Sequence, residues 1–478
     1  MFETVLEHVN DIHIKPHSVD DLTLAGLKRL ERIDPAASIE RHGDEIQLLI
    51  NGTAISTARA GTADDPVGWA ATVEHLIIEG RNVSGALQAT DNEKLFKTVI
   101  DGIVGELDRY SRYADRKAAR QQREDREGFG GVGISILGDE DGARIQRVTK
   151  DMPANRNDVR VGDIITAADG DALKGMPLGK IVRLLRGPVG TTVTLSLRRD
   201  GQESPLVRTL VRARVIPITV FFENHGNIGY LRMSGFNQDT TRELSEGIAQ
   251  AQREIGARLK GVVIDLRGNP GGLLDQAVDS ADLFLAGGRI SSTRGRHPDS
   301  QQIFDATHST IADGIPVVML LDGASASASE VLAAALQDTG RAVLVGSRSF
   351  GKGTVQTVLQ MPNAGELILT WARLLSPSGY VLHRLGVVPT VCTSSADDEN
   401  DADAILQRAL DEGESRRQIS MRRMVDDNDP KAVKAVAALC PWQPHSGKDV
   451  DIEVAKRLLE TPGLYQKALR TTTLNAGS

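Results

Sequence analysis

The chain has few aromatic residues and no excess of positive charge. Aromatic residues make up 4% of the 478 residues, which argues against the rows of stacking rings found in proteins that bind single-stranded nucleic acid. The formal net charge is -8, so the sequence also lacks the basic footprint of a nucleic-acid-binding surface. We therefore expect no nucleic acid among the partners of this protein.

The cysteines and histidines form no metal-binding motif. Cys392 and Cys440 cannot form a zinc site alone, and nothing in the sequence demands a disulfide between them. His13 and His17 have helical i, i+4 spacing, but Pro16 lies between them and no HExxH pattern is present. We therefore expect no metal site, whereas Ser–His–Asp catalysis stays open because triad partners can lie far apart in sequence.

Long apolar runs are also missing. No stretch approaches the ~18–20 apolar residues of a membrane-spanning helix. Residues 1–7 lack the basic and apolar regions of a signal peptide. Two locations follow as alternatives: the cytoplasm, or an exported location for a mature chain whose signal segment has been removed.

The sequence that is present divides into four regions. Residues 1–126 have mostly helical apolar spacing, with one weak strand pattern at 46–50. Residues 127–214 contain short strand-like runs and form a compact module. Strands and helices alternate over 215–395, which predicts an α/β core, and 396–478 begins acidic and continues with helical spacing.

Three alternating serines lie where an apolar strand at 316–321 turns into a helix predicted over 327–337. The first N–H groups of a helix favour developing negative charge, so a serine there can attack a carbonyl while the next N–H stabilises the oxyanion. The alternative interpretation is a helix cap, because Ser327 and Glu330 fit a capping box. The segment alone does not say which of the serines reacts, Ser325, Ser327 or Ser329.

Lys352 lies between two glycines, shortly after a strand predicted at 342–345. As a general base it must be neutral near pH 7, and burial can lower a lysine pKa by several units from about 10.4. The stretch from Gly346 to Lys352 also matches the start of a phosphate-binding loop. However, Gly353 stands where that motif needs Ser or Thr, and a strand-like segment follows where it needs a helix.

Three further features accompany these motifs. Gln356 lies on the same strand face as Lys352, where a neutral amide can orient the amine without charging it. The glycine-rich turn at 267–272 can offer a second oxyanion N–H. The loop at 130–134 can bind a peptide carboxylate while the peptide adds a strand. Each feature also has an ordinary explanation, as a strand residue or a turn.

Residues 107–393 together resemble the carboxyl-terminal processing peptidases, or tail-specific proteases, which are serine/lysine endopeptidases with a PDZ domain. The resemblance depends on the motifs at 325–330, 334–338 and 350–356, in that order. It implies a multidomain α/β (α+β) fold, in which a crotonase-like protease core carries an inserted PDZ domain and helical N- and C-terminal regions. The expected domains are 1–126 (helical), 127–214 (PDZ), 215–395 (protease core) and 396–478 (helical).

The resemblance also implies roles for individual residues. Ser327 is the expected nucleophile, Lys352 the general base, and Gln356 the residue that orients the lysine. The oxyanion donors are the backbone N–H groups of Ala328 and Gly271. The expected peptide-binding residues are those of the loop that opens the PDZ segment: Gly131, Val132, Gly133 and Ile134.

The expected function is that of a serine endopeptidase that cleaves proteins recognised through their C-terminal tails, without a cofactor. The expected partners are protein or peptide substrates with free apolar C-termini, and an activating adaptor and a homo-oligomer stay open. Because family members are usually exported, a periplasmic or otherwise exported location is expected, with the cytoplasm as the alternative. Two other functions stay open, a catalytically silent PDZ scaffold that binds peptides and a nucleotide-binding protein of the phosphate-loop type.

Overall fold

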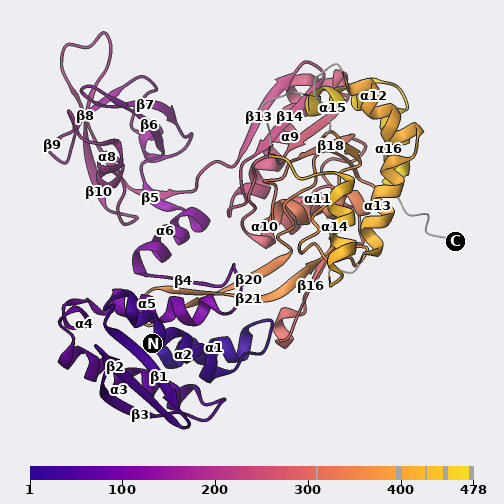
Figure 1. The fold of residues 1–478 in the computed structure, drawn as a ribbon. Coiled ribbons are helices and arrows are strands. Elements are labelled where there is room, and N and C mark those ends of the chain that lie inside the picture. The colour runs from indigo at the N-terminus through magenta and orange to yellow at the C-terminus, as the bar shows by residue number, and fades with distance from the viewer. Residues whose placement is uncertain (308–309, 395–400, 426–427, 445–449, 473–478) are drawn as a thin grey trace. The chain divides into compact units, whose positions relative to one another are not determined.

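The structure is a computed structural model that describes residues 1–307, 310–394, 401–425, 428–444 and 450–472. The chain divides into two units (Figure 1). The core unit comprises Met1–Arg120, Thr219–Phe236 and Thr240–Ser478, and the insert unit comprises Gln121–Ile218 with Asn237–Asp239. The insert unit therefore interrupts the sequence of the core unit.

A six-stranded sheet organises the core unit, with the strand order β13-β14-β15-β18-β19-β22. The strands from β14 to β22 run parallel, and β13 pairs antiparallel with β14. Helices α9, α10 and α11 connect successive parallel strands. The strands are β13 (Val220–His225), β14 (Ile228–Met233), β15 (Gly261–Asp265), β18 (Val317–Leu321), β19 (Ala342–Gly346) and β22 (Val391–Cys392), and the helices are α9 (Thr240–Ile255), α10 (Leu274–Asp282) and α11 (Ala328–Asp338).

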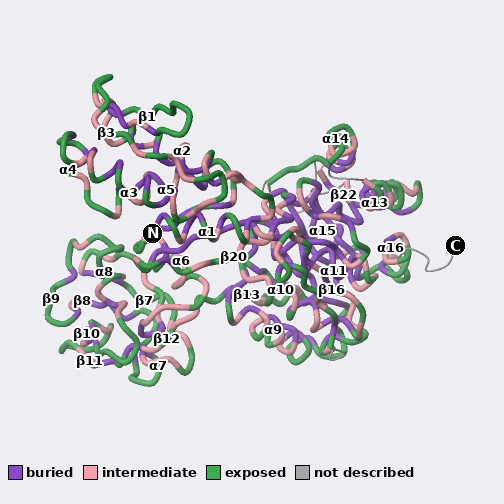
Figure 2. Tube along the Cα trace, turned by 90° about the horizontal axis from the view of Figure 1, so that it is seen from below, coloured by how far each residue is buried: buried purple, intermediate pink, exposed green. Residues whose placement is uncertain are grey.

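Helices cover both faces of this sheet. Along β18, Val317, Met319 and Leu321 pack with α9, α10 and α11, whereas Val318 and Leu320 pack with α12, α15 and α16. Side chains alternate along a strand, so a strand covered on both faces is apolar at every position. Figure 2 shows the surroundings of α11 and α15 as largely buried. The C-terminal helices are α12 (Ala402–Leu406), α13 (Glu414–Met424), α14 (Pro430–Leu439), α15 (Val450–Glu460) and α16 (Leu464–Thr472).

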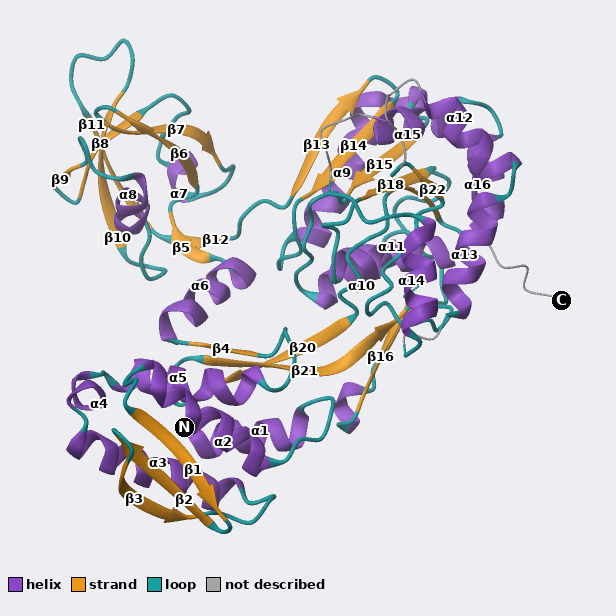
Figure 3. Ribbon diagram, in the orientation of Figure 1, coloured by secondary structure: helices purple, strands orange, loops and turns teal. Residues whose placement is uncertain are grey.

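The N-terminal part of the core unit contains a three-stranded antiparallel sheet besides its helices (Figure 3). Its apolar core includes Trp69 and Leu76 of α3 together with Leu367 and Leu369 of β21, a strand far along the chain. These elements are α1 (Phe2–Ile12), α2 (Val19–Lys28), β1 (Ala37–His42), β2 (Glu45–Ile50), β3 (Thr53–Arg59), α3 (Pro66–Val83), α4 (Gly85–Ala89) and α5 (Asn92–Gly105).

A second sheet of the core unit has the order β17-β16-β21-β20, and β4 pairs with β21. It brings the segment that follows α5 next to β21, which in turn pairs with β20, the strand that follows Lys352. This sheet therefore positions much of the candidate site. Its strands are β4 (Arg112–Ala114), β16 (Arg289–Gly295), β17 (Ile303–Asp305), β20 (Thr354–Gln360) and β21 (Glu366–Leu375).

The insert unit is a β-rich module that follows α6 (Arg116–Glu127), with the strand order β11-β10-β8-β7-β6 and β9 beside β8. Its core joins Ile145, Ile165 and Leu195 of the sheet to Ile181 and Leu185 of α8. β6 lies at the edge of this sheet. The elements are β5 (Phe129–Gly131), β6 (Ile134–Asp139), β7 (Gly142–Val148), α7 (Pro153–Arg156), β8 (Ile164–Ala168), β9 (Asp171–Ala172), α8 (Leu178–Leu185), β10 (Thr192–Arg198), β11 (Leu206–Val211) and β12 (Ala213–Val215).

Some residues of the expected C-terminal region, 396–400 among them, lie outside the described residues. Among the helices that the structure does describe, none is both long and apolar enough to cross a bilayer.

Candidate active site

The three alternating serines take different positions at the junction of β18 and α11. Ser325 and Ser329 are both fully buried. Ser325 Oγ donates to the carbonyl of Leu266 (2.8 Å), and Ser329 Oγ donates to the carbonyl of Asn269 (3.0 Å). Ser327 is only partly buried. The outer serines thus fasten this segment to the 266–269 turn, and Ser327 is the one of the three that is not fully buried.

Ser327 has an unusual backbone conformation, with φ 59° and ψ −114°. Residues other than glycine seldom adopt a positive φ, and strained backbone of this kind clusters at functional sites. The residue directly precedes α11, whose first turn has N–H groups without partners inside the helix. Ala328 is the first residue of that helix. A serine on such a turn is exposed, with a backbone donor close to it.

The glycine-rich turn lies directly against Ser327. A Cβ atom at Gly271, where φ is 97°, would lie 2.8 Å from Ser327 Cβ and 2.9 Å from Ala328 N, so only glycine fits there. However, the Gly271 N–H donates to Asn269 Oδ1 (2.9 Å). An Asn side chain often binds the backbone two residues on in this way. The predicted oxyanion donors are therefore neighbours, but in this conformation the Gly271 N–H is already used.

Lys352 lies in the loop between β19 and β20, with its Nζ 5.3 Å from the centre of the Tyr110 ring. Burial lowers the pKa of this amine below its ordinary value, and the charges of Arg112 and Arg109 lower it further, while Glu330 acts in the opposite direction. Lys352 forms no ion pair with any residue that the structure describes. Its environment therefore favours the neutral amine that a general base needs.

No hydrogen bond joins Lys352 Nζ to Ser327 Oγ among the described residues. The two residues are instead connected through their backbones. Glu330 Oε2 accepts hydrogen bonds from Ser327 N (2.8 Å) and from Lys352 N (2.9 Å). One carboxylate thus holds the main chains of Ser327 and Lys352, although their side chains are not hydrogen-bonded to each other.

Glu330 is fully buried and accepts two more hydrogen bonds at Oε1, from Gly351 N (2.7 Å) and Ser349 Oγ (2.5 Å). Burial raises the pKa of this carboxyl, and the four donors act in the opposite direction. The sequence interpretation assigned Glu330 only to a helix cap. No local pattern in the sequence indicates this wider role, because only the fold brings Glu330 to the loop around Lys352.

Gln356 does not contact Lys352 by a hydrogen bond in this structure. Its Nε2 donates to Thr354 Oγ1 (3.0 Å) and to Thr370 Oγ1 (3.3 Å). A register shift between Val355 and Gln356 interrupts the pairing of β20 with β21, so the simple alternation assumed from sequence does not hold here. The role of Gln356 in orienting the lysine stays a prediction.

The geometry around Lys352 does not fit a phosphate-binding loop. That loop must lead into a helix whose N-terminus faces the phosphates. In this structure β20 begins at Thr354, directly after Gly353. The described residues also contain no group of three or more His, Cys, Asp or Glu side chains suited to hold a metal ion.

The predicted peptide-binding residues lie in the loop between β5 and β6. Gly131 ends β5, Ile134 begins β6, and Val132 is buried. The Val132 and Gly133 carbonyls accept from Ala154 N (2.9 Å) and from the N–H of Thr149 (2.8 Å), which fixes the loop. Because β6 is an edge strand, a peptide can add to it as a further strand.

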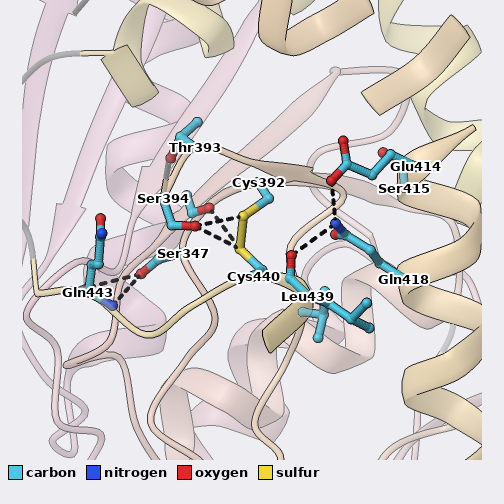
Figure 4. The surroundings of a disulfide bond; sticks show 12 residues. Ser347, Cys392, Thr393, Ser394, Glu414, Ser415, Gln418, Leu439, Cys440 and Gln443 are labelled. Atoms are coloured by element: carbon cyan, nitrogen blue, oxygen red, sulfur yellow. Dashed lines mark hydrogen bonds between the residues drawn. A yellow bond between two sulfur atoms is a disulfide. The ribbon is translucent and has the colours of Figure 1, made fainter. Parts of the chain in front are cut away.

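A disulfide joins Cys392 to Cys440 (Figure 4), a pairing that the sequence did not demand. It connects the end of β22 to the segment that follows α14. Just beyond it, Gln443 O accepts from Gly323 N (2.7 Å) and from Ser347 Oγ (2.9 Å), and the Trp442 indole N–H donates to the Gly323 carbonyl. The disulfide thus holds a C-terminal segment against the loop that leads to Ser327.

Comparisons with known proteins place matches over both units. A family model described as peptidase family S41 matches residues 227–393, and a PDZ domain model matches residues 130–207. A carboxy-terminal-processing protease of Bartonella bacilliformis is 40% identical over 303 residues, which are 63% of this chain and 70% of that protein. The range matched by the peptidase model contains the serine loop and Lys352, and the range matched by the PDZ model contains the 131–134 loop.

Two more similar proteins cover comparable parts. A probable CtpA-like serine protease of Staphylococcus aureus is 34% identical over 304 residues, and the chain spans 60% of its length. A solved structure of a photosystem II D1 C-terminal processing protease has 27% sequence identity and a TM-score of 0.38, with 65% of this chain and 87% of that chain covered.

Proposed function

Because this chain belongs to peptidase family S41, the carboxy-terminal-processing serine proteases that use a Ser/Lys dyad, we propose that Ser327 and Lys352 form its dyad. The chain has the multidomain α/β fold of such proteins, a crotonase-like protease core with a PDZ domain and helical regions. Peptide C-termini are the ligands of PDZ domains, and the substrates of the protease core are proteins.

In the proposed reaction, neutral Lys352 takes the proton from Ser327 Oγ, and the alkoxide attacks the scissile carbonyl. Ala328 N–H stabilises the oxyanion, and Gly271 N–H joins it after turning away from Asn269. Water then releases the acyl group, with Lys352 as the base again. The open dyad is a resting geometry, and substrate binding brings the amine to the hydroxyl.

The single observation that carries this proposal is the carboxylate of Glu330, which binds the backbone N–H of both Ser327 and Lys352. An acceptor shared in this way sets the spacing of the two main chains. Only side-chain rotation and small loop shifts then remain before the amine meets the hydroxyl. Of the three alternating serines, Ser327 is also the one that is not fully buried.

Labelling with a fluorophosphonate probe tests the nucleophile. We expect Ser327→Ala to lose both labelling and digestion of an unfolded protein with an apolar C-terminus. Ser329→Ala, which removes a buried hydroxyl in the first turn of α11, should keep the label and is the matched control. Lys352→Ala and Lys352→Arg should both be inactive, because arginine stays protonated. Full digestion by Ser327→Ala would refute the assignment, and folded wild type that is neither labelled nor active would favour a silent scaffold.

For the insert unit, we propose that free apolar C-termini bind the 131–134 loop while the substrate tail pairs with β6. A Cβ atom at Gly133, where φ is 80°, would lie 2.3 Å from Met152 Cβ. Gly133→Ala should therefore distort the loop and raise KM for tailed substrates, with kcat less affected. Gly179→Ala is the control, because a Cβ there meets nothing within 4 Å. Equal KM values for the two variants would contradict this binding site.

We also propose an exported, periplasmic-type location, which the disulfide between Cys392 and Cys440 supports because disulfides persist in oxidising compartments. Finding both thiols reduced in cells after rapid alkylation would contradict it. The open dyad supports an activating adaptor as a further proposal. Self-association is a separate proposal that sedimentation of the full chain tests.

A further inference from the structure

A cavity of about 640 Å³ lies in the core unit, beside the segment that precedes β4. This volume is in the range of small-molecule sites, roughly 300–1,000 Å³. Although the chain as a whole has a net charge of -8, five cationic side chains and one carboxylate line this cavity. We call it the cationic cavity; its cations are Lys15, Arg109, Arg294, Arg373 and Arg384.

The single carboxylate, Asp108, is engaged elsewhere. It accepts hydrogen bonds from Ser111 Oγ (2.7 Å), from Thr370 Oγ1 (3.1 Å) and from the N–H of Tyr110 (2.7 Å), and it pairs with His13 Nε2 (3.0 Å). Burial alone would raise the pKa of Asp108, but these hydrogen bonds outweigh it and hold the pKa well below its ordinary value. Asp108 is therefore ionised, and its oxygens serve these donors rather than the cations of the cavity.

The cations repel one another. Arg294 of β16 and Arg373 of β21 are directly opposite in the antiparallel register, and like charges at such positions are unfavourable. Lys15, Arg294 and Arg384 form no ion pair with any residue in the described part of the chain. Arg109 lies over the rings of Tyr110 and Phe350. An anion in the cavity would relieve this repulsion, and guanidinium groups bind carboxylates and phosphates through paired hydrogen bonds.

We propose that the cationic cavity binds a small anion with two or more negative charges, such as a phosphate ester or a tricarboxylate, and that the bound anion inhibits cleavage. A polyvalent ligand matches Lys15, Arg294 and Arg384, the three of these cations that form no ion pair in the described part of the chain, better than a single carboxylate would. The first half of the proposal concerns binding and stands alone, whereas the second half rests on the proposed function.

The cationic cavity lies close to Lys352. Tyr110 lines it, and the centre of the Tyr110 ring lies 5.3 Å from Lys352 Nζ. The charged or titratable groups that act on this amine are Arg109, Tyr110 and Arg112 from one segment and Glu330 from α11. An anion beside Arg109 screens one of the positive charges that keep Lys352 neutral. By linkage, a protonated Lys352 binds the anion more tightly, and the bound anion holds the lysine protonated.

Binding is measured first, on full-length Ser327→Ala protein, so that turnover plays no part. Pyrophosphate and citrate are titrated separately by calorimetry, with acetate at equal ionic strength as the monovalent control. We expect one site for at least one of the two polyvalent anions and none for acetate; the preferred probe shows whether phosphate or carboxylate chemistry is recognised. Absence of binding by both polyvalent probes would overturn the proposal.

The location of the site is tested with two arginines of the same strand. Arg294→Gln should weaken binding at least tenfold. Arg289→Gln is the matched control, because Arg289 lies on β16 but pairs with Asp305 (2.5 Å) outside the cavity. Equal affinity in the two variants, both checked for an unchanged melting midpoint, would remove the cationic cavity as the site.

The coupling is tested by the pH profile of kcat/KM in the wild-type protein. The bound anion should move the acidic limb of the profile to higher pH, and Arg294→Gln should abolish that shift. Inhibition without a shift of the limb would refute the coupling to Lys352. If the wild-type protein cleaves nothing, the proposed function fails while the binding result still stands, so the two failures are distinguishable.

Discussion

Replacement of Glu330 by Gln tests the shared acceptor in the candidate site. The four donors divide between the two carboxylate oxygens: Ser327 N and Lys352 N bind Oε2, whereas Gly351 N and Ser349 Oγ bind Oε1. An amide must place an NH2 group against one of these pairs. The Ser349 hydroxyl can turn and accept a hydrogen bond, but a backbone N–H cannot. We therefore expect the amide NH2 on the Oε1 side, where it leaves the Gly351 N–H without an acceptor.

The magnitude follows from that orientation. A hydrogen bond to a charged group contributes about 1.5–3 kcal/mol, and an unsatisfied buried donor costs about 1–3 kcal/mol. Glu330→Gln should thus lower the free energy of unfolding by about 2.5–6 kcal/mol, a large part of the 5–15 kcal/mol typical of folded proteins. Activity should fall less than in Glu330→Ala, because the amide oxygen still binds Ser327 N and Lys352 N.

The assay combines guanidinium unfolding with kcat/KM for a tailed substrate. Ser349→Ala is the informative companion, because it removes one donor but leaves the two hydrogen bonds to the dyad residues. It should cost stability and leave most of the activity. The reasoning is refuted if Glu330→Gln unfolds within about 0.5 kcal/mol of the wild type, the range of neutral surface changes.

Three other perturbations have defined outcomes. Arg112→Gln should raise the pKa of Lys352, because the charge of Arg112 lowers it in the wild type. The acidic limb of the pH profile of kcat/KM should then move to higher pH. A limb at the wild-type pH would show that this charge does not act on the amine. Replacing Cys392 and Cys440 by Ser opens a loop of 48 residues, so guanidinium unfolding should show a loss of about 2–4 kcal/mol, and an unchanged midpoint would contradict that. Asp108 has a depressed pKa in the folded state, so its contribution to stability is present above about pH 4, the unfolded value, and is lost as pH falls through the folded value. The difference in unfolding free energy between wild type and Asp108→Asn should accordingly shrink in acid, and a difference that stays constant would exclude this role.

Local sequence signals predicted the α/β core well. The helix predicted at 240–255 has those bounds in α9, and the strands predicted at 261–266 and 316–321 appear as β15 and β18. Apolar runs and helical periodicity are local properties of the sequence, and in these elements the packing agrees with them. In contrast, β1 and β3 of the N-terminal sheet are mostly polar or partly exposed, so their sequences lack a clear alternation, and only the pattern at 46–50 indicated a strand.

The parts of the site that sequence missed depend on contacts between distant segments. Glu330 receives donors from residues 19 to 22 positions away, and Asp108 binds Thr370 across 262 positions. No spacing rule connects such residues. The disulfide is similar, because its two cysteines meet only after the C-terminal helices pack on the core. Sequence also could not say that the Gly271 N–H is bound to Asn269, since the direction of a peptide plane in a glycine turn is decided by its neighbours.

The covalent link between Cys392 and Cys440 turns the intervening chain into a closed ring, with Trp442 and Gln443 attached just outside it. A single cut anywhere from 393 to 439 would therefore release no fragment until a reductant is added. The C-terminal piece would remain seated against Gly323, so a nicked molecule would run as two bands only on a reducing gel. Cleavage within this ring would therefore leave Trp442 and Gln443 in contact with the loop that leads to Ser327.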